Sequence, residues 1–271
     1  MNGIFDYPML ILALSFSALW LSTWVGASIL RKKRSMDDDV REDFNTILVS
    51  TLTLNGLIIG FSFSMAISRY DQRKVYEEAE ANAIGTEYVR ADLLPGAAAD
   101  KARSLLRSYL DQRILFYKAR GGQELQEINA RTAQLQSELW TTVGEVGAAQ
   151  QTPIVALAVA GMNDVLNAQG YTQAAWWNRI PPGAWSLMVS IAIVGNLLVG
   201  YGVKNLKAES VLLVVLPFVF SVSFLLIGDI DSPRGGVIRV KPQNLVKLAE
   251  SIRPPASRAY GAGAAALKDA P

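Results

Sequence analysis

The chemistry open to this 271-residue chain is limited, because it contains no His and no Cys. It therefore has no disulfide, no thiolate site for zinc or an iron–sulfur cluster, and no Ser-His or Cys-His nucleophile. Three adjacent acids, Asp37, Asp38 and Asp39, resemble a metal-binding run. However, five basic residues share their segment, and neighbouring loop carboxylates are usually solvated. We expect no catalytic residue, no metal site and no cofactor, which argues against a hydrolase or an oxidoreductase.

The pattern that best indicates a function is a stripe of hydroxyl and bulky apolar residues between residues 50 and 68. Its members recur every three or four residues and so share one face of a helix, with hydroxyls at both ends and Leu57 and Phe61 in the middle. Such a face suits a wet channel with a hydrophobic constriction. The alternative is that the hydroxyls bond to their own backbone and the apolar side chains face lipid. The six residues are Ser50, Thr53, Leu57, Phe61, Ser64 and Ser68.

Two other faces of the same helix have different compositions. Gly56 and Gly60 form a small-xxx-small pair, which allows another helix to approach closely. A third face is expected to meet neighbouring helices, and it contains Asn55, Ile59, Ser62 and Ala66.

A pore lined by this helix would require more than one chain. A single chain can hardly enclose a water-filled path that one helix lines, so several copies would have to surround an axis in a cyclic homo-oligomer.

The elements that position this stripe are membrane helices. The chain is 51% apolar and 18% charged, with a mean hydropathy of +0.22, whereas about a quarter of the residues in a soluble domain are charged. Four uncharged apolar runs reach the roughly 20 residues that a bilayer requires: residues 8–30, 45–68, 184–203 and 210–228. The first has no basic n-region and exceeds a signal-peptide h-region, so we expect it to stay uncleaved. We assign residues 8–68 and 184–228 to two pairs of transmembrane helices.

The polar insert between these pairs, residues 69–183, is expected to be a helical extramembrane domain. Apolar residues at helical spacing predict one helix that continues the second span to Leu94-Pro95-Gly96, and two more within residues 106–117 and 125–143. A fourth begins with Thr152 as N-cap and Pro153 at the first helical position. No strand alternation of useful length occurs, so the fold class is all-α. Residues 229–252 form a C-terminal segment with a short helix at 243–252, and residues 253–271 a disordered tail.

Several motifs, in order, resemble the bestrophin channels. Gly60-Phe61, then seven residues, then Arg69-Tyr70 and a long charged helix resemble the pore helix of that family, most closely its prokaryotic bestrophin-like group, formerly a domain of unknown function. Residues 106–110, the Pro181-Pro182 pair and residues 229–235 resemble further family motifs. The likeness covers roughly residues 10–252.

The resemblance implies a homopentamer with one axial pore lined by the second membrane helix. Its neck would be Thr53, Leu57 and Phe61, of which Thr53 is more polar than the family pattern, so the constriction has either two or three rings. Arg69 at the pore mouth would attract anions or, the reading we favour, anchor the helix exit. The resemblance favours small inorganic anions as permeant ions, and the plasma (inner) membrane of a bacterium as location. The lipid bilayer and other copies are the expected partners, and a net charge of +2 does not suggest nucleic acid.

Two departures from the family pattern bear on regulation and topology. Residues 235–240 replace the acidic run of calcium-activated members, so we expect no calcium clasp, and we expect Asp229 and Asp231 to act as capping or salt-bridge residues. The basic residues 31–34 place that end of the first span in the cytoplasm, whereas the family topology places it outside. The orientation stays open. The alternative function is a non-conducting membrane sensor or scaffold whose helical insert binds a partner protein.

Overall fold

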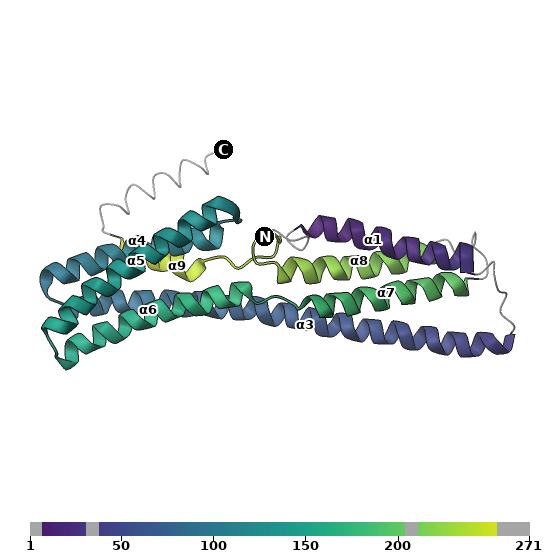
Figure 1. The fold of residues 1–271 in the computed structure, drawn as a ribbon, viewed down its shortest axis with the longest axis horizontal. Helices are drawn as coiled ribbons and strands as arrows, with labels where there is room; N and C mark the ends of the chain where they lie inside the picture. Colours follow the sequence, from purple (N-terminus) through teal and green to yellow (C-terminus); the bar gives the residue numbers. More distant parts are fainter. Residues whose placement is uncertain (1–6, 31–37, 204–210, 254–271) are drawn as a thin grey trace. The chain divides into compact units, whose positions relative to one another are not determined.

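The computed structural model describes residues 7–30, 38–203 and 211–253, and all regular structure in these ranges is helical (Figure 1). This confirms the all-α class. The basic residues 31–34, on which the charge-based orientation depends, lie outside the described residues, as do Asp37 and residues 254–271 of the tail. The elements are α1 (Pro8–Val25), η2 (a π-helix, Gly26–Leu30), α3 (Asp38–Arg90), η3 (Ala91–Leu93), α4 (Gly96–Lys118), α5 (Gly122–Ala149), α6 (Pro153–Trp177), α7 (Pro182–Gly202), α8 (Leu212–Asp231) and α9 (Gln243–Ile252).

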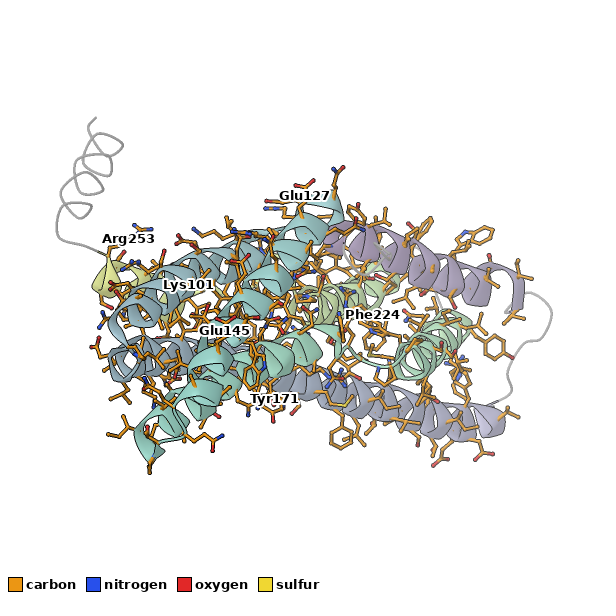
Figure 2. The ribbon with its side chains drawn as sticks, turned by 60° about the vertical axis from the view of Figure 1, so that its left-hand side comes forward. Lys101, Glu127, Glu145, Tyr171, Phe224 and Arg253 are labelled. Carbon is orange, nitrogen blue, oxygen red and sulfur yellow. The ribbon has the colours of Figure 1, made fainter. Side chains whose placement is uncertain are left out.

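The chain divides into two compact units, and α3 contributes to both. Residues 1–71 and 178–239 form the membrane unit, with α1, the first part of α3, α7 and α8. Among the described residues, four helical stretches are long and apolar enough to cross a membrane. The first two predicted spans fall within such stretches, and the last two largely overlap with them. Residues 72–177 and 240–271 form the extramembrane unit. Exposed charged residues such as Lys101, Glu127 and Glu145 belong to this second unit (Figure 2).

An apolar core holds the membrane unit together. Phe224 of α8 is buried there and packs edge-on against Trp185 of α7, with ring centroids 6.3 Å apart (Figure 2). Ala66 places one face of α3 in the same core. Burial of these side chains orients α3 within the unit, because the helix must turn this face inward. The buried members are Ile11, Leu19, Ala66, Ile180, Trp185, Met188, Ala192, Phe220, Phe224, Ile227 and Ile230.

Small residues bring α1 and η2 into backbone contact with α7. A Cβ on Gly200 would overlap the carbonyl oxygen of Thr23, and one on Gly26 would overlap that of Leu197. Asn196, the polar residue of the third predicted span, is satisfied at this crossing. Its amide donates to the Ala192 carbonyl at 2.8 Å and its Oδ1 accepts from the Thr23 hydroxyl at 3.2 Å. Close approach and a shared hydrogen bond fix this helix pair.

Local signals set the helix ends of the extramembrane unit. The predicted N-cap of α6 is confirmed, since the Val155 amide donates to the Thr152 hydroxyl at 3.2 Å. Gly121 and Gly122, at the junction between α4 and α5, have φ of 124° and 69°, a region that suits glycine. The predicted helix at 243–252 is also confirmed, as α9.

A buried aromatic cluster of Phe116, Tyr117 and Trp176 forms part of the core of this unit, with ring centroids 5.0 to 5.6 Å apart.

Candidate pore face and its surroundings

All six residues of the predicted pore stripe are exposed in the single chain. The Leu57 side chain is 52% exposed and that of Phe61 is 62% exposed, although both lie in the middle of an uncharged membrane segment. Thr51 bonds back to the Ile47 carbonyl at 2.8 Å. The stripe hydroxyls, in contrast, donate no hydrogen bond to the described part of the protein. These hydroxyls belong to Ser50, Thr53, Ser64 and Ser68.

The opposite face of α3 packs against the rest of the membrane unit. Asn55 and Ala66 are fully buried and Ser62 nearly so, while Ile59 packs against the core, which confirms the prediction that this face meets neighbouring helices. Neither amide atom of the Asn55 side chain has a hydrogen-bond partner within the described residues. The helix is therefore anchored on one side and open on the other.

Gly56 and Gly60 lie beside the open face. A Cβ built on either glycine would meet nothing within 4 Å, so no other helix in the described part of the chain packs closely against them. The small-xxx-small pair thus has no partner inside the described protomer. Close packing at these glycines stays a prediction, and it now concerns a second copy of the chain.

Arg69 follows the stripe at the end of the membrane segment. Its Nη1 donates to the Oδ1 of Asn178 at 2.9 Å, which ties α3 to the segment that precedes α7. The contact anchors this end of α3 through the amide oxygen of Asn178. Sequence reasoning could not find this partner, because 109 residues separate the two side chains.

Asp229 and Asp231, at the end of α8, accept hydrogen bonds from backbone amides of two different segments, one after α8 and one before α7. Asp229 accepts from the Val237 and Ile238 amides at 2.7 and 2.8 Å, and both oxygens of Asp231 lie 3.1 Å from the Ile180 amide. Both side chains are buried. The expectation that they cap the chain is confirmed. Among the described residues, no three His, Cys, Asp or Glu side chains gather as they would around a metal ion.

In the extramembrane unit, the face of α3 that is buried is largely charged. The apolar residues by which the sequence indicates this helix, such as Val75 and Val89, are exposed instead. Charged residues along a helix usually face solvent, so sequence reasoning missed this face. The sequence feature that could have identified this buried face is the recurrence of its residues at alternating spacings of four and three. The residues at this spacing, all buried, are Arg73, Glu77, Glu80, Ile84, Glu87 and Ala91.

Glu80 lies at the centre of a fully buried network. It forms an ion pair with Arg113 of α4, and it accepts from the hydroxyls of Tyr117 at 3.3 Å and Thr172 at 3.1 Å. Burial lowers the pKa of Arg113, but the charge and hydrogen bond of Glu80, together with Tyr109 and Tyr117, outweigh it and the pKa is raised. Burial, with the Glu80 charge adding to it, raises the pKa of the Tyr117 hydroxyl. The network joins α3, α4 and α6 and presents no reactive group to solvent.

Glu77 binds the start of the C-terminal helix. One of its oxygens accepts from the backbone amides of Asn244 at 2.9 Å and Leu245 at 3.0 Å, and the other accepts from the Asn244 side chain at 2.7 Å. Amides at a helix N-terminus lack partners within the helix and favour a negative charge. Glu77 therefore supplies the cap of α9 from a distant part of the chain.

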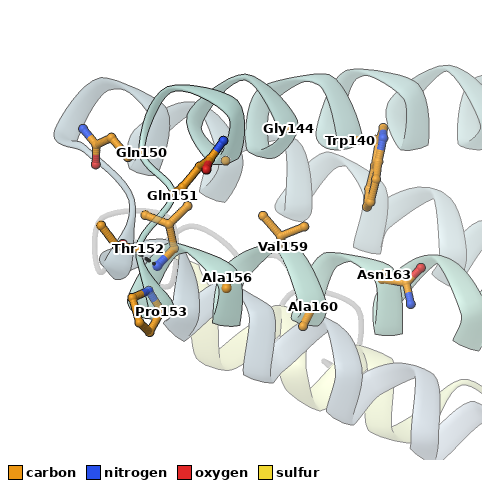
Figure 3. Close-up of a pocket in the computed structure, with 12 residues that line it drawn as sticks. Trp140, Gly144, Gln150, Gln151, Thr152, Pro153, Ala156, Val159, Ala160 and Asn163 are labelled. Carbon is orange, nitrogen blue, oxygen red and sulfur yellow. Dashed lines mark hydrogen bonds between the residues drawn. The ribbon is translucent and has the colours of Figure 1, made fainter.

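A groove of about 770 Å³ lies between α5 and α6, close to the loop that joins them (Figure 3). Trp140, 44% exposed, lines it at some distance from Gln150 and Gln151 in the connecting loop. Small residues on both helices leave the space open, and its lining includes no charged side chain. The groove offers apolar surface and neutral hydrogen-bonding groups rather than groups for catalysis. Its lining residues are Trp140, Gly144, Gly147, Gln150, Gln151, Thr152, Pro153, Val155, Ala156, Val159, Ala160 and Asn163.

Comparison with known proteins agrees with this architecture. The family model for the Bestrophin-like domain matches residues 13–245. The fold is similar to the crystal structure of a bacterial bestrophin homolog from Klebsiella pneumoniae, with a TM-score of 0.63 and 12% identity over 90% of this chain and 96% of that chain. A single-residue variant of the Klebsiella pneumoniae homolog gives a TM-score of 0.59 with 14% identity, over 91% of this chain and 98% of the other. No curated protein matches the chain.

Proposed function

The chain belongs to the Bestrophin-like family, and from that premise we propose that it is an ion channel whose axial pore is lined by the exposed face of α3. We further propose a homopentamer in the plasma (inner) membrane that passes small inorganic ions, with a preference for anions. The observation that carries the proposal is the position of the stripe. An uncharged face with hydroxyls at both ends remains uncovered, while the opposite face of the same membrane helix is buried.

Several copies of α3 would turn this face from an open surface into a closed path. The stripe hydroxyls donate to no described group, so they can hydrogen-bond to water and help to solvate an ion. Gly56 and Gly60 leave room beside the stripe for a neighbouring copy. A cyclic arrangement places the same residue of each copy at one level along the axis. Each stripe residue would then form a ring around the pore.

The apolar rings of Leu57 and Phe61 form the proposed neck. A narrow apolar segment can block ions by excluding water, and it opens when it widens or becomes more polar. Thr53 adds a third, more polar ring on one side of the neck. No charged side chain belongs to the stripe, so the anion preference is supported by the family resemblance alone.

The neck assignment is tested by truncating its side chains. We expect Leu57→Ala with Phe61→Ala to raise the conductance of channels reconstituted in planar bilayers, because a wider and less apolar neck stays wet. Phe63→Ala is the matched control. It removes the same kind of side chain two residues away, from a position outside the stripe that is 37% exposed. Currents in the double variant equal to those of the wild type would reject the neck.

The second candidate function is a non-conducting sensor or scaffold that binds a partner protein. The observation that favours it is the uncharged groove between α5 and α6, which offers apolar surface and neutral hydrogen-bonding groups to a partner (Figure 3). Particle imaging of the purified protein separates the two candidates. Five copies with α3 innermost and a central opening support the channel, whereas a dimer with the stripe against lipid supports the scaffold.

A further inference from the structure

Glu87 is a buried carboxyl that, unlike its neighbours on the same helix face, lacks hydrogen-bond donors. Its side chain is 1% exposed, and neither carboxyl oxygen has a hydrogen-bond partner within the described residues. Glu77 and Glu80, about three and two turns earlier on the buried face of α3, each accept three or more hydrogen bonds. The contrast shows that the extramembrane unit can supply hydrogen-bond donors to a buried glutamate. Among the described residues, it supplies none to Glu87.

The surroundings of Glu87 are a glycine and two charged side chains. Gly161 of α6 lies so close to a Glu87 oxygen and to the Arg90 guanidinium that a Cβ there would overlap both. Arg90 is three residues further along α3, and its Nη1 lies 4.0 Å from the Oδ2 of Asp164 on α6. The charged groups that act on Glu87 are therefore Arg90 on its own helix and Asp164 on the helix packed against it.

This environment favours the neutral carboxylic acid. Burial penalises the carboxylate, which here has no donor to compensate for lost water. Burial raises the pKa of Glu87 from 4.5 to about 8, an effect that the Arg90 charge reduces and the Asp164 charge increases. Glu87 is thus protonated at neutral pH, and the Arg90 guanidinium pairs with the Asp164 carboxylate instead.

We propose that Glu87, Arg90 and Asp164 form a proton-operated switch between α3 and α6. With the proton bound, Glu87 is neutral and Arg90 pairs with Asp164. When the proton leaves for solvent, the buried carboxylate draws Arg90 away from Asp164, and the contact at Gly161 rearranges. The switch itself goes beyond the proposed channel function. Its effect on ion flow rests on that function, because α3 also carries the pore stripe.

The titration is tested by thermal melting of the full chain in detergent between pH 4 and pH 9.5. Below pH 4.5 the carboxyl is protonated in both the folded and the unfolded chain, so it contributes no pH dependence. Between pH 4.5 and about 8 the unfolded chain releases the proton and the folded chain keeps it, so stability falls as the pH rises. We expect Glu87→Gln to melt progressively above the wild type across this window, with the widest gap above pH 8. Glu78→Gln, an exposed acid of the same helix, is the control.

Variants of the two partners test the arrangement of charges. Asp164→Asn removes a charge that raises the Glu87 pKa, so the upper end of the window should move to lower pH. Arg90→Gln removes the cation that lowers the same pKa and should move it to higher pH. Parallel curves for the wild type and Glu87→Gln, or partner shifts of the wrong sign, would overturn the proposal.

The rearrangement and its coupling to flow have separate readouts. Amide hydrogen exchange in residues 82–92 and 157–167 should rise above pH 8 in the wild type and in Glu78→Gln, but not in Glu87→Gln, after correction for intrinsic rates. An exchange pattern that is the same in all three would also overturn the switch. Ion flux in liposomes should follow the same pH midpoint and lose it in Glu87→Gln. An absence of flux at every pH would count against the channel, while melting and exchange still decide the switch.

Discussion

At the residue scale, two buried asparagines of the membrane unit differ in whether their side-chain amides have a hydrogen-bond partner, and this difference affects stability. Asn196 of α7 bonds both to its own helix and to the Thr23 hydroxyl, whereas the amide of Asn55 on α3 has no partner within the described residues. A buried polar group without a hydrogen bond costs roughly 1–3 kcal/mol. Asn55 therefore weakens the packing of the helix that carries the proposed pore face.

Replacement of this amide by an apolar side chain of similar size should stabilise the protein. We expect Asn55→Leu to raise the melting temperature in detergent, because it removes an unsatisfied amide from an apolar contact. Asn196→Leu is the matched control and should lower it, since the bond from Thr23 would be lost. A lower melting temperature for Asn55→Leu would show that the amide has a partner in the assembled protein.

At the scale of elements, Glu77 is the strongest link between α9 and α3. Its carboxylate accepts three hydrogen bonds from the first residues of α9. Apolar contact adds to this link, since the Leu248 side chain reaches to within 3.0 Å of a Cβ placed on Gly85 of α3. A helix of ten residues is too short to be stable alone, so its order depends on these contacts.

Removal of the Glu77 carboxylate should therefore release α9 while the rest of the unit stays folded. We expect Glu77→Ala to increase amide hydrogen exchange throughout residues 243–252. Glu78→Ala, on an exposed position of the same turn, should leave the exchange unchanged. Equal protection of α9 in both variants would mean that apolar packing alone holds the helix.

At the scale of the whole molecule, the glycines of the membrane unit divide into two kinds. Gly26 and Gly200 permit backbone contact within one chain, and any side chain there would overlap a carbonyl. A Cβ on Gly56 or Gly60 would meet nothing within 4 Å among the described residues of the same chain. If they serve the assembly, a bulky residue at these positions should disturb the oligomer and spare the protomer.

This difference predicts opposite outcomes for two sets of variants. Gly56→Leu with Gly60→Leu should give a folded, helical protein with a reduced number of copies, measured by circular dichroism and mass photometry. Gly200→Leu should instead lower the yield of folded protein, because the α1–α7 crossing cannot form. An unchanged copy number in the double variant would remove these glycines from the proposed interface.

The sequence by itself determined where the helices lie and several of their ends. The four apolar spans, the Thr152 cap, the glycine break before α5 and α9 all follow from short-range hydrogen bonding and periodicity, which neighbouring residues contain. It also separated the packed face of α3 from the stripe, because Asn55, Ser62 and Ala66 recur at helical spacing opposite Leu57 and Phe61.

Only the tertiary structure decided which charged residues of α3 are buried and what each one meets. Glu80 and Thr172 are 92 residues apart, and Glu77 and Asn244 are 167 apart. The burial of a charge depends on such a distant partner, and nothing in the local pattern around Glu77, Glu80 or Glu87 distinguishes a satisfied glutamate from an unsatisfied one. The apolar period of the same segment revealed the helix, yet Val75 and Val89 face outward, because the ion pair and the caps occupy the inner side.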